Sequence, residues 1–348
     1  MFERASKFLR GMWLQLAAMM AVWTILAVPA FMAKTSAQPL KVDRNIPRYE
    51  PVRGVSGHVR SVGSDSMHGE ILLWAETFNT IYPKVSIQIE GKGSSTAPPA
   101  LVEGRAHLAP MSRPMLSEEI ETFEEKFGYP PTAVRTSLGV LAVYVHWDNP
   151  IESLTLPQLD AIFSKTRRSG YAKDIKTWGD LGLEGEWAEK PINLYGRNAA
   201  SGTHAYFKEH VLFAGDYKDC VKEQADSDAV IRAIGSEKFA IGYSGIVYKT
   251  ADVRAVPLRT SESTRAVVPS MDNSIPNMDN GYRARYPLSR YLYVYVNKAP
   301  NRALDPLRLE FLKFVLSYEG QEDVLRDGYV PLPLKIVLEE RKNIGVAD

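Results

Sequence analysis

Three short stretches of the chain combine glycines, hydroxyl side chains and the expected start of a helix. They read GSDS at 63–66, GKGSS at 91–95 and SGT at 201–203, and each follows a β-type run. The first turn of a helix leaves backbone N–H groups without partners, and their partial positive charge attracts anions. Ser and Thr hydroxyls add donors that can rotate toward a ligand. Three such stretches in one chain therefore indicate a site for an oxyanion.

Two charged residues accompany these stretches. Arg197 lies four residues before Ser201, and its planar guanidinium can donate two parallel hydrogen bonds to an oxyanion. A surface salt bridge is the alternative for this arginine. Asp65 and Ser66 can contact a ligand, but either can instead cap the helix that follows, because Asp and Ser are preferred at helix N-caps. Both alternatives stay open at this point.

The elements that must position these residues are predicted to alternate between strand and helix. Strands are expected to lead into the three stretches, at 58–62, 85–89 and 190–194. Helices are expected to follow them, at 67–82, from Pro98 toward Gly104 and at 204–213. Two continuous apolar runs, 138–145 and 291–296, are typical of central strands. The chain is thus predicted to be an α/β protein.

The remaining segments are predicted to support this framework. Residues 38–56 have no hydrophobic period, so a linker or a loosely packed lead-in is expected there. Ser117 is expected to cap a charged helix that ends at Phe127 and exposes a solvated face. A short strand is expected at 108–111, and further helices within 154–165 and at 228–234, 308–316 and 321–326.

Composition excludes some classes of function. The chain has 348 residues, of which 45% are hydrophobic and 24% charged, as in soluble globular proteins. This length predicts two domains. The net charge is +1, and residues 1–37 contribute +3 from four basic and one acidic residue, which leaves −2 for the rest. A near-neutral body of this kind argues against binding to nucleic acid, which requires clustered Lys and Arg.

The N-terminus predicts export. Residues 1–37 combine a charged start, an apolar stretch from Met12 to Met32 and small residues before a cleavage site after Ala37, so they are expected to be a signal peptide. Cleavage after Ala30 is the second choice, and an uncleaved membrane anchor is the alternative. Cys220 is the only cysteine, which excludes an intrachain disulfide, and the six histidines lack ligand spacing. We therefore expect a periplasmic protein with no cofactor and no metal.

Four motifs in this order resemble the phosphate-binding (PstS-like) periplasmic proteins that serve ABC importers. They are GSDSM at 63–67, GKGSSTAPPAL at 91–101, MSR at 111–113 and YGRNAASGT at 195–203. The resemblance implies a type II periplasmic-binding-protein fold, in which two α/β lobes are joined by two crossing hinge strands and hold the ligand in a cleft. The apolar runs would be the hinge strands. Lobe 1 would then comprise residues 57–144 and 290–340, and lobe 2 residues 145–289.

The resemblance also implies which residues bind the anion. It places contacts to inorganic phosphate at Ser66, Met67, Ser94, Ser112, Arg197, Ser201, Gly202 and Thr203. Asp65, Ser95 and Arg113 are additional candidates. The implied mechanism is capture by hinge closure. The implied partners are an inner-membrane ABC permease and its ATPase, and the protein is expected to act as a monomer.

Two positions depart from the family pattern. Ser112 stands where well-known members carry an Asp, whose carboxylate accepts the proton of hydrogen phosphate and repels sulfate. Ala199 stands where they carry an acidic partner for the arginine, so Arg197 is expected to be more mobile or to leave the site more positive. Arg113 is expected either to add a cation to the site or to face solvent.

Other functions stay open on the sequence alone. The ligand could be another tetrahedral oxyanion, namely sulfate, molybdate or an organic phosphate. A surface or scavenging protein on the same fold, without a role in transport, is a further alternative. An enzyme is not expected, because Ser201 and His204 lack the G-x-S-x-G turn that would surround a nucleophilic serine.

Overall fold

The computed structural model describes residues 40–276 and 284–346. The expected signal peptide at 1–37 lies outside this range. Within it, no helix has the length and apolar character needed to cross a membrane.

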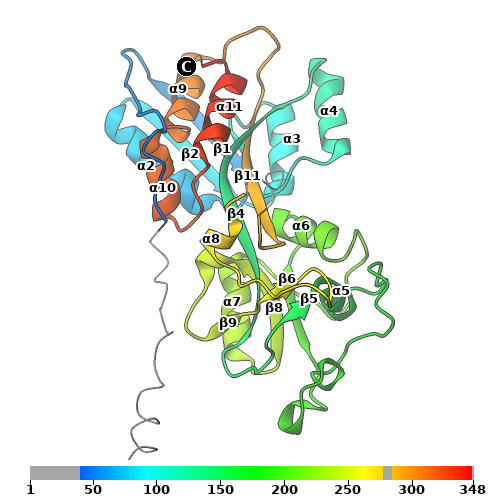
Figure 1. Cartoon of the computed structure of the whole chain (residues 1–348). Coiled ribbons are helices and arrows are strands. Elements are labelled where there is room, and N and C mark those ends of the chain that lie inside the picture. The colour runs from blue at the N-terminus through cyan, green and yellow to red at the C-terminus, as the bar shows by residue number, and fades with distance from the viewer. Residues whose placement is uncertain (1–39, 277–283, 347–348) are drawn as a thin grey trace, which may run out of the picture. The chain divides into compact units, whose positions relative to one another are not determined.

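The first group of elements surrounds a parallel strand pair. Strands β1 (Gly57–Gly63) and β2 (Val85–Gly91) pair in register from Gly57↔Val85 to Gly63↔Gly91, and a parallel bridge from Ser61 to Leu108 leads to β3 (Ala109–Met111). Figure 1 shows the helices of this group around these strands. They are α2 (His68–Ile81), α3 (Ala97–Val102), α4 (Ser117–Phe127), α9 (Pro306–Val315), α10 (Tyr318–Arg326) and α11 (Leu334–Ile344).

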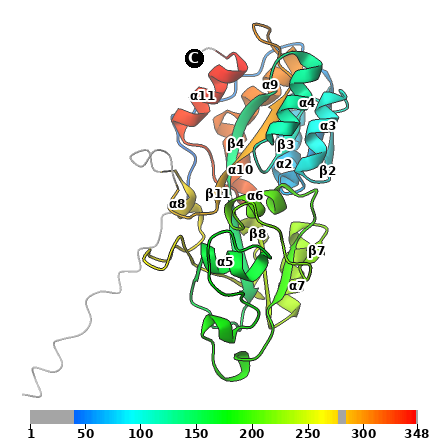
Figure 2. The same ribbon diagram turned by 90° about the vertical axis from the view of Figure 1, so that its right-hand side faces the viewer.

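The second group is built on a mixed sheet. Its strands β6 (Asn193–Arg197) and β8 (Ala240–Gly245) are parallel, and β7 (Lys222–Gln224) adds to the edge beside β6. Figure 2 shows α5 and α7 on this sheet. The other elements are α5 (Leu156–Phe163), α6 (Gly202–His210), α7 (Ser227–Ser236), α8 (Met271–Ser274), β9 (Val253–Ala255) and the parallel pair β5 (Leu154–Thr155) and β10 (Leu258–Arg259).

Two long strands run through both groups. The first part of β4 (Thr132–His146) pairs antiparallel with β11 (Ser289–Val296), and its second part pairs with β8 and β9. Strand β11 also pairs with β3. These strands contain the apolar runs 138–145 and 291–296, so the prediction of two central crossing strands is confirmed. Residues 136–145 of β4 are buried on both faces of the strand, which explains the lack of apolar–polar alternation in the run 138–145.

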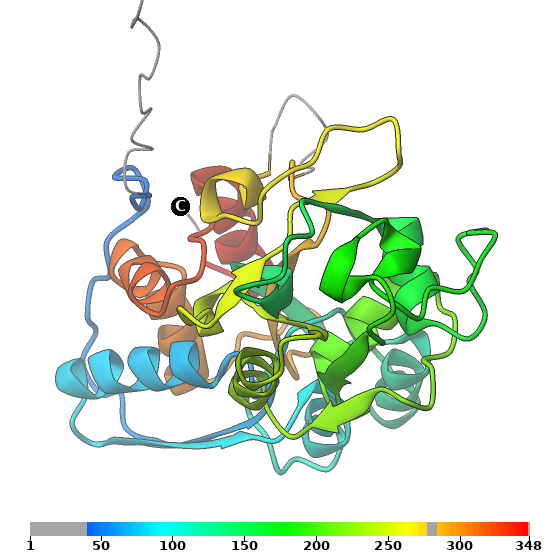
Figure 3. The ribbon, with the colours of Figure 1, turned by 90° about the horizontal axis from the view of Figure 1, so that it is seen from below.

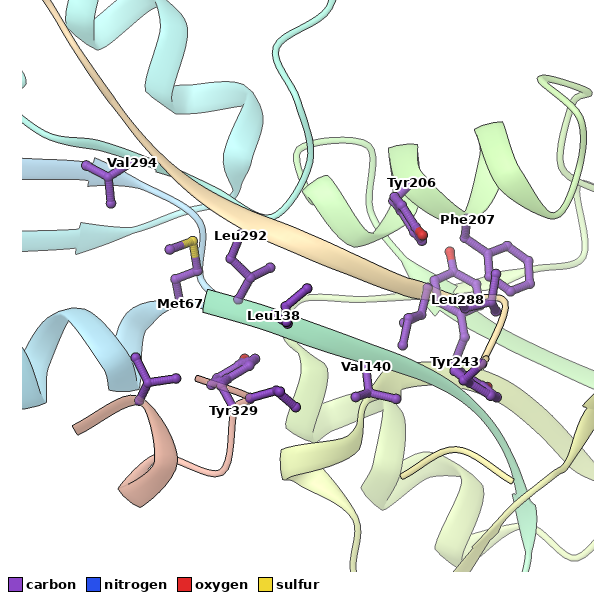
Figure 4. Close-up of a cluster of buried hydrophobic side chains, with 14 of the residues drawn as sticks. Met67, Leu138, Val140, Tyr206, Phe207, Tyr243, Leu288, Leu292, Val294 and Tyr329 are labelled. Atoms are coloured by element: carbon purple, nitrogen blue, oxygen red, sulfur yellow. The ribbon is translucent and has the colours of Figure 1, made fainter. Parts of the chain in front are cut away.

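The main apolar cluster of the core follows these strands. In Figure 4, Phe207 and Tyr243 lie at one end of the paired strands, and Met67 and Tyr329 lie at the other. The rings of Phe207 and Tyr243 are stacked with their centroids 3.9 Å apart. Such packing fixes the start of α6, which carries part of the expected site.

Residues 40–56 correct one expectation. They are not loosely packed, because Val42, Ile46 and Val55 are buried in the core. The N–H of Tyr318 donates to the carbonyl of Pro47 over 2.9 Å, which ties this segment to the start of α10. Figure 3 shows the blue lead-in passing along the orange helices. The sequence hides this packing because tertiary contacts, rather than a local period, hold the segment.

Helix α4 corrects another expectation. Its N-cap is Leu116 rather than Ser117, and the Glu119 side chain accepts the N–H of Leu116 over 2.8 Å. The helix is also more than a solvated face, because Phe123 is fully buried beneath it.

Candidate anion-binding site

The three hydroxyl-rich stretches meet in the structure. The hydroxyl oxygens of Ser66 and Thr203 lie 3.3 Å apart, although 137 residues separate them. The N–H of Ser95 donates to the carbonyl of Ala200 over 3.1 Å, so the second stretch also contacts the third. The stretches follow β1, β2 and β6, so the C-terminal ends of these three strands position them close together.

The second stretch forms a tight hydroxyl cluster with the MSR motif. Ser94 opens a 3₁₀ turn, and its Oγ accepts the N–H of Ser112 over 3.0 Å and lies 3.3 Å from the Ser112 Oγ. Gly202 packs against both side chains. A Cβ at Gly202 would lie 2.2 Å from the Ser94 Oγ and 2.6 Å from the Ser112 Oγ. Only glycine allows this approach.

The third stretch begins a helix as predicted. Ser201 is the N-cap of α6, and its hydroxyl accepts the N–H of Thr203 over 3.2 Å. Ser201 and Thr203 are both buried. The first turn of α6 begins at Gly202, which packs against Ser94 and Ser112, so the positive end of this helix lies beside the region where the stretches meet.

The first stretch does not cap its helix through a side chain. Helix α2 begins at His68, and its N-cap Met67 makes no side-chain cap. The N-capping interpretation of Asp65 and Ser66 is therefore wrong. Ser66 is held instead by Tyr329, whose hydroxyl donates to the Ser66 carbonyl over 2.5 Å. Burial raises the pKa of the Tyr329 hydroxyl, so it remains a donor.

Arg197 is buried and paired across the site. It is 2% exposed, and its Nη2 lies 2.8 Å from the Oδ2 of Asp65. Its Nη1 donates to the Ser227 hydroxyl over 2.9 Å, and its Nη2 to the Ala225 carbonyl over 3.0 Å. The alternative of a surface salt bridge is thus wrong for this arginine. These contacts also argue against the expected mobility of its side chain. Asp65 takes the place of the acidic partner that is missing at Ala199.

Asp65 has a second oxygen that is free. Its Oδ1 is buried and has no hydrogen-bond partner among the residues that the structure describes. Buried carboxylate oxygens are usually paired, so this oxygen is suited to accept a hydrogen bond from a ligand.

Arg113 neither faces solvent nor adds an unpaired cation to the site, so both alternatives expected from the sequence are wrong. Its side chain is only 3% exposed, so it does not face solvent. Its two terminal nitrogens contact the two carboxylate oxygens of Glu119 at 2.6 and 2.7 Å, so the pair adds no net cation to the site. The same guanidinium lies 3.4 Å from the Ser95 hydroxyl. Ser95 therefore uses both its N–H and its hydroxyl to join protein segments.

Sequence reasoning missed Arg290 of β11. This residue is 8% exposed, and its Nη2 donates to the Thr203 Oγ1 over 2.8 Å. A signal was present, because Arg290, Leu292 and Val294 alternate along the strand and all three are buried. An arginine at an inward position of an apolar strand is rarely fully buried unless it has a partner.

His204 does not supply a base for Ser201. Burial, with the charges of Lys208 and Arg197, lowers the pKa of His204 to about 4, so the ring is neutral near pH 7. The ring stacks on Tyr217 with centroids 4.5 Å apart. In the described part of the chain, the Ser201 hydroxyl accepts a hydrogen bond from its own helix, and no hydrogen bond joins it to this histidine.

An acidic cavity lies beside the donor cluster. It has a volume of about 500 Å³, and Asp65, Asp226, Asp228 and Asp327 contribute carboxylates to its lining. Among the described residues that line this cavity, Asp65 is the only one expected to belong to the site. Burial raises the pKa of Asp327 to about 6, although its carboxylate accepts the N–H of Glu70. Over the described ranges, no group of three or more His, Cys, Asp or Glu residues could hold a metal ion.

Comparisons with known proteins show what this chain is similar to. Residues 50–319 match the model of the PBP superfamily domain. The chain is 49% identical over 333 residues to the phosphate-binding protein PstS of Pseudomonas aeruginosa PAO1, which covers 96% of this chain and 100% of that protein. It is 25% identical to the phosphate-binding protein PstS of Staphylococcus haemolyticus, with 85% and 88% covered.

A solved structure shares the fold. An ABC-type phosphate transport receptor from Vibrio cholerae superposes with a TM-score of 0.60 at 22% identity, over 79% of this chain and 100% of that chain. The expected type II periplasmic-binding-protein fold is confirmed. The sequence match, the domain match and the fold together show that this chain belongs to the PstS family of phosphate-binding proteins.

Proposed function

We propose that this protein captures inorganic phosphate by closing two lobes around it and presents it to an inner-membrane ABC permease and its ATPase. The observation that carries the proposal is the meeting of Ser66 and Thr203, 3.3 Å apart and from opposite groups of elements, beside the buried Arg197. The relatives named above are phosphate-binding proteins, which supports the same ligand here.

The lobes follow from the path of the two long strands. We assign residues 57–144 and 290–340 to lobe 1 and residues 145–289 to lobe 2. The change of partner along β4, from β11 to β8, supports a boundary near Leu141. A bend at this point would separate the two groups while each keeps its own sheet.

Eight residues are proposed to hold the anion. They are Ser66, Met67, Ser94, Ser112, Arg197, Ser201, Gly202 and Thr203, and they offer hydroxyl, backbone N–H and guanidinium donors. Hydrogen bonds to a charged group contribute about 1.5–3 kcal/mol each, so six to eight of them can offset the cost of closure and give roughly micromolar or tighter binding. Because Ser66, Ser94 and Ser201 are buried, the lobes must separate to admit the ligand.

Asp65 is proposed to select phosphate over sulfate. Ser112 brings no carboxylate, but the Asp65 Oδ1 is buried and unpaired within the described residues. This oxygen can accept the proton of hydrogen phosphate, whereas it would repel sulfate, which has no proton to donate near neutral pH. The same carboxylate orients Arg197 through its other oxygen.

The proposed role is binding without catalysis, in the periplasm. Removal of residues 1–37 would release the mature protein, which we expect to be monomeric. The half-buried, neutral His204 supports this role, because no hydrogen bond from it to Ser201, as a general base would need, is found among the described residues. Binding of another tetrahedral oxyanion, above all sulfate, is the second candidate, because Ser112 removes the usual carboxylate from that position.

Calorimetric titration tests the proposal. Protein that lacks residues 1–37 is unfolded and refolded to remove bound anions, and then titrated with phosphate and with sulfate at pH 5 to 8.5. We expect micromolar or tighter binding of phosphate and at least about 100-fold weaker binding of sulfate. Equal binding of both anions would refute the role of Asp65 in selection, and no heat with either anion would refute phosphate capture.

A further inference from the structure

Arg290 occupies an unusual position for a charged residue. It lies opposite Gly139 in the β11–β4 pair, at the start of a run in which alternate side chains are buried. The residues that share its face are Leu292 and Val294, which belong to the core. A cation at this position loses its hydration, and burial lowers the pKa of the Arg290 guanidinium accordingly.

The contacts of Arg290 do not balance its charge. Its Nη2 donates to the Thr203 hydroxyl over 2.8 Å, and its guanidinium carbon lies 4.9 Å from the centre of the Tyr206 ring. Its Nε and Nη1 are buried and have no hydrogen-bond partner among the described residues. No carboxylate in this part of the chain forms an ion pair with it. Hydrogen-bonding capacity of this kind is rarely left unused unless a ligand completes it.

The other buried arginines of this region are paired. Arg197 contacts Asp65, and Arg113 contacts Glu119. Arg290 is therefore a buried cation with which no described carboxylate forms an ion pair, although the charge of Asp65 acts on it from a greater distance. It also borders the donor cluster directly, because the Thr203 hydroxyl that accepts from Arg290 lies 3.3 Å from the Ser66 hydroxyl.

We propose that Arg290 is a second cationic contact for the bound oxyanion, supplied by a crossing strand instead of a helix start. This inference rests on the proposed function. The second negative charge of hydrogen phosphate would supply the counter-charge that Arg290 lacks. By accepting from Arg290, the Thr203 hydroxyl also keeps its own hydrogen free to donate to the anion. Ligand binding thereby acts on β11, one of the two strands that join the lobes.

The variant Arg290→Met tests the proposal, because methionine keeps much of the side-chain volume without the charge. We expect phosphate affinity, measured by calorimetry, to fall about 10- to 100-fold. We also expect the melting temperature of the phosphate-free protein to stay equal or rise, because an unpaired buried charge has been removed. Arg290→Lys retains the charge, and we expect its loss of affinity to be smaller.

A purely structural role predicts the opposite result. If Arg290 only supports Thr203 and Tyr206, Arg290→Met lowers the melting temperature and leaves phosphate affinity within about twofold of the unmodified protein, which would overturn the proposal. Arg135→Met is the matched control. Arg135 also stacks on a tyrosine, 5.3 Å from the Tyr291 ring, but it is paired with Glu340 and lies outside the site. We expect this control to lose stability and to keep its phosphate affinity.

The same titrations separate this inference from the proposed function. If the unmodified protein binds phosphate and Arg290→Met binds it equally well, the role of Arg290 is overturned and phosphate capture stands. Absence of phosphate binding in the unmodified protein would overturn phosphate capture, and the role of Arg290 in it, together.

Discussion

The region around Arg113 and the region around Arg197 and Arg290 both bury guanidinium groups, but they balance charge differently. At Arg113 one carboxylate, Glu119, faces one guanidinium at 2.6 and 2.7 Å. Around Arg197 and Arg290, Asp65 is the only carboxylate that forms an ion pair within the described residues. The Arg113 pair joins α4 to the MSR motif, whereas the second region lies where hydroxyl groups from both element groups meet.

The presence or absence of a paired carboxylate distinguishes a structural cation from a ligand-binding cation. A buried ion pair contributes little net stability but becomes costly when one partner is removed. An unpaired buried cation costs stability in the free protein, so its retention indicates that a ligand supplies the counter-charge. The two regions should therefore respond in opposite ways to mutation, one in stability and the other in binding.

The largest effect is expected at the closest approach within the binding region. Gly202→Ala would place a Cβ 2.2 Å from the Ser94 Oγ, so the lobes could no longer close fully. We expect phosphate affinity to fall by about 100-fold, or ~3 kcal/mol, in calorimetric titration. The melting temperature without phosphate serves as the control and should change little if the two groups can separate. Unchanged affinity would show that Gly202 and Ser94 do not approach each other in the bound state.

Glu119→Gln should affect the Arg113 region alone. The variant leaves the buried Arg113 without its counter-charge, so we expect the free energy of unfolding to fall by about 2 kcal/mol, a value reduced from that of a fully buried pair because Glu119 is partly exposed. Denaturant titration measures this change, and phosphate affinity should stay the same. The exposed neighbour Glu118→Gln is the matched control. A clear loss of phosphate affinity in Glu119→Gln would show that the Arg113 region also takes part in binding, contrary to the proposed difference between the two regions.

Asp65→Asn should change which anion the binding region prefers. The amide can still accept a hydrogen bond from Arg197, but it no longer repels an unprotonated anion. We expect the ratio of phosphate affinity to sulfate affinity to fall by about tenfold, or ~1.4 kcal/mol, in paired titrations. An unchanged ratio would mean that Asp65 serves Arg197 and takes no part in selection.

Asp327 offers the reverse case, a half-buried carboxyl group that forms no ion pair with a described residue. Its pKa of about 6 in the folded protein exceeds the usual value, so the folded state binds its proton more tightly than the unfolded state. The resulting stabilisation is complete below about pH 4 and is lost as the pH rises through about 6. Asp327→Asn should therefore gain stability relative to the unmodified protein over this window, by about 1 kcal/mol after allowance for partial exposure. Unfolding at pH 4 and pH 7 measures the gain, and an equal difference at both values would contradict the shifted pKa.

Local patterns predicted much of the fold and part of the site. The helix start at Ser201 and the two crossing strands were predictable because glycine, hydroxyl and apolar patterns act over a few residues. Helix α11 and the packing of residues 40–56 were not, because contacts with distant elements stabilise them. The pairing of Asp65 with Arg197 also joins residues far apart in the chain, and the local preference of Asp for N-caps left capping and ligand contact equally open.

Arg290 was missed for a different reason. Its inward position follows from the alternation of Arg290, Leu292 and Val294, but a charged residue directly before the apolar run 291–296 is typical of a strand end that faces solvent. Whether a charge in a buried strand has a partner depends on the tertiary structure. Which nitrogens of Arg290 are paired therefore depends on the packing of α6 against β11, which the sequence does not give.

A crystal structure of the mature protein with phosphate would show directly whether the three stretches and Arg290 hold one anion. We expect one phosphate within about 3 Å of donors from Ser66, Ser94, Arg197 and the first turn of α6, with an Arg290 nitrogen on the same anion. We also expect the Asp65 Oδ1 at hydrogen-bonding distance from a phosphate oxygen. Phosphate bound elsewhere, or bound here with Arg290 turned away and paired with a carboxylate, would rule out this site.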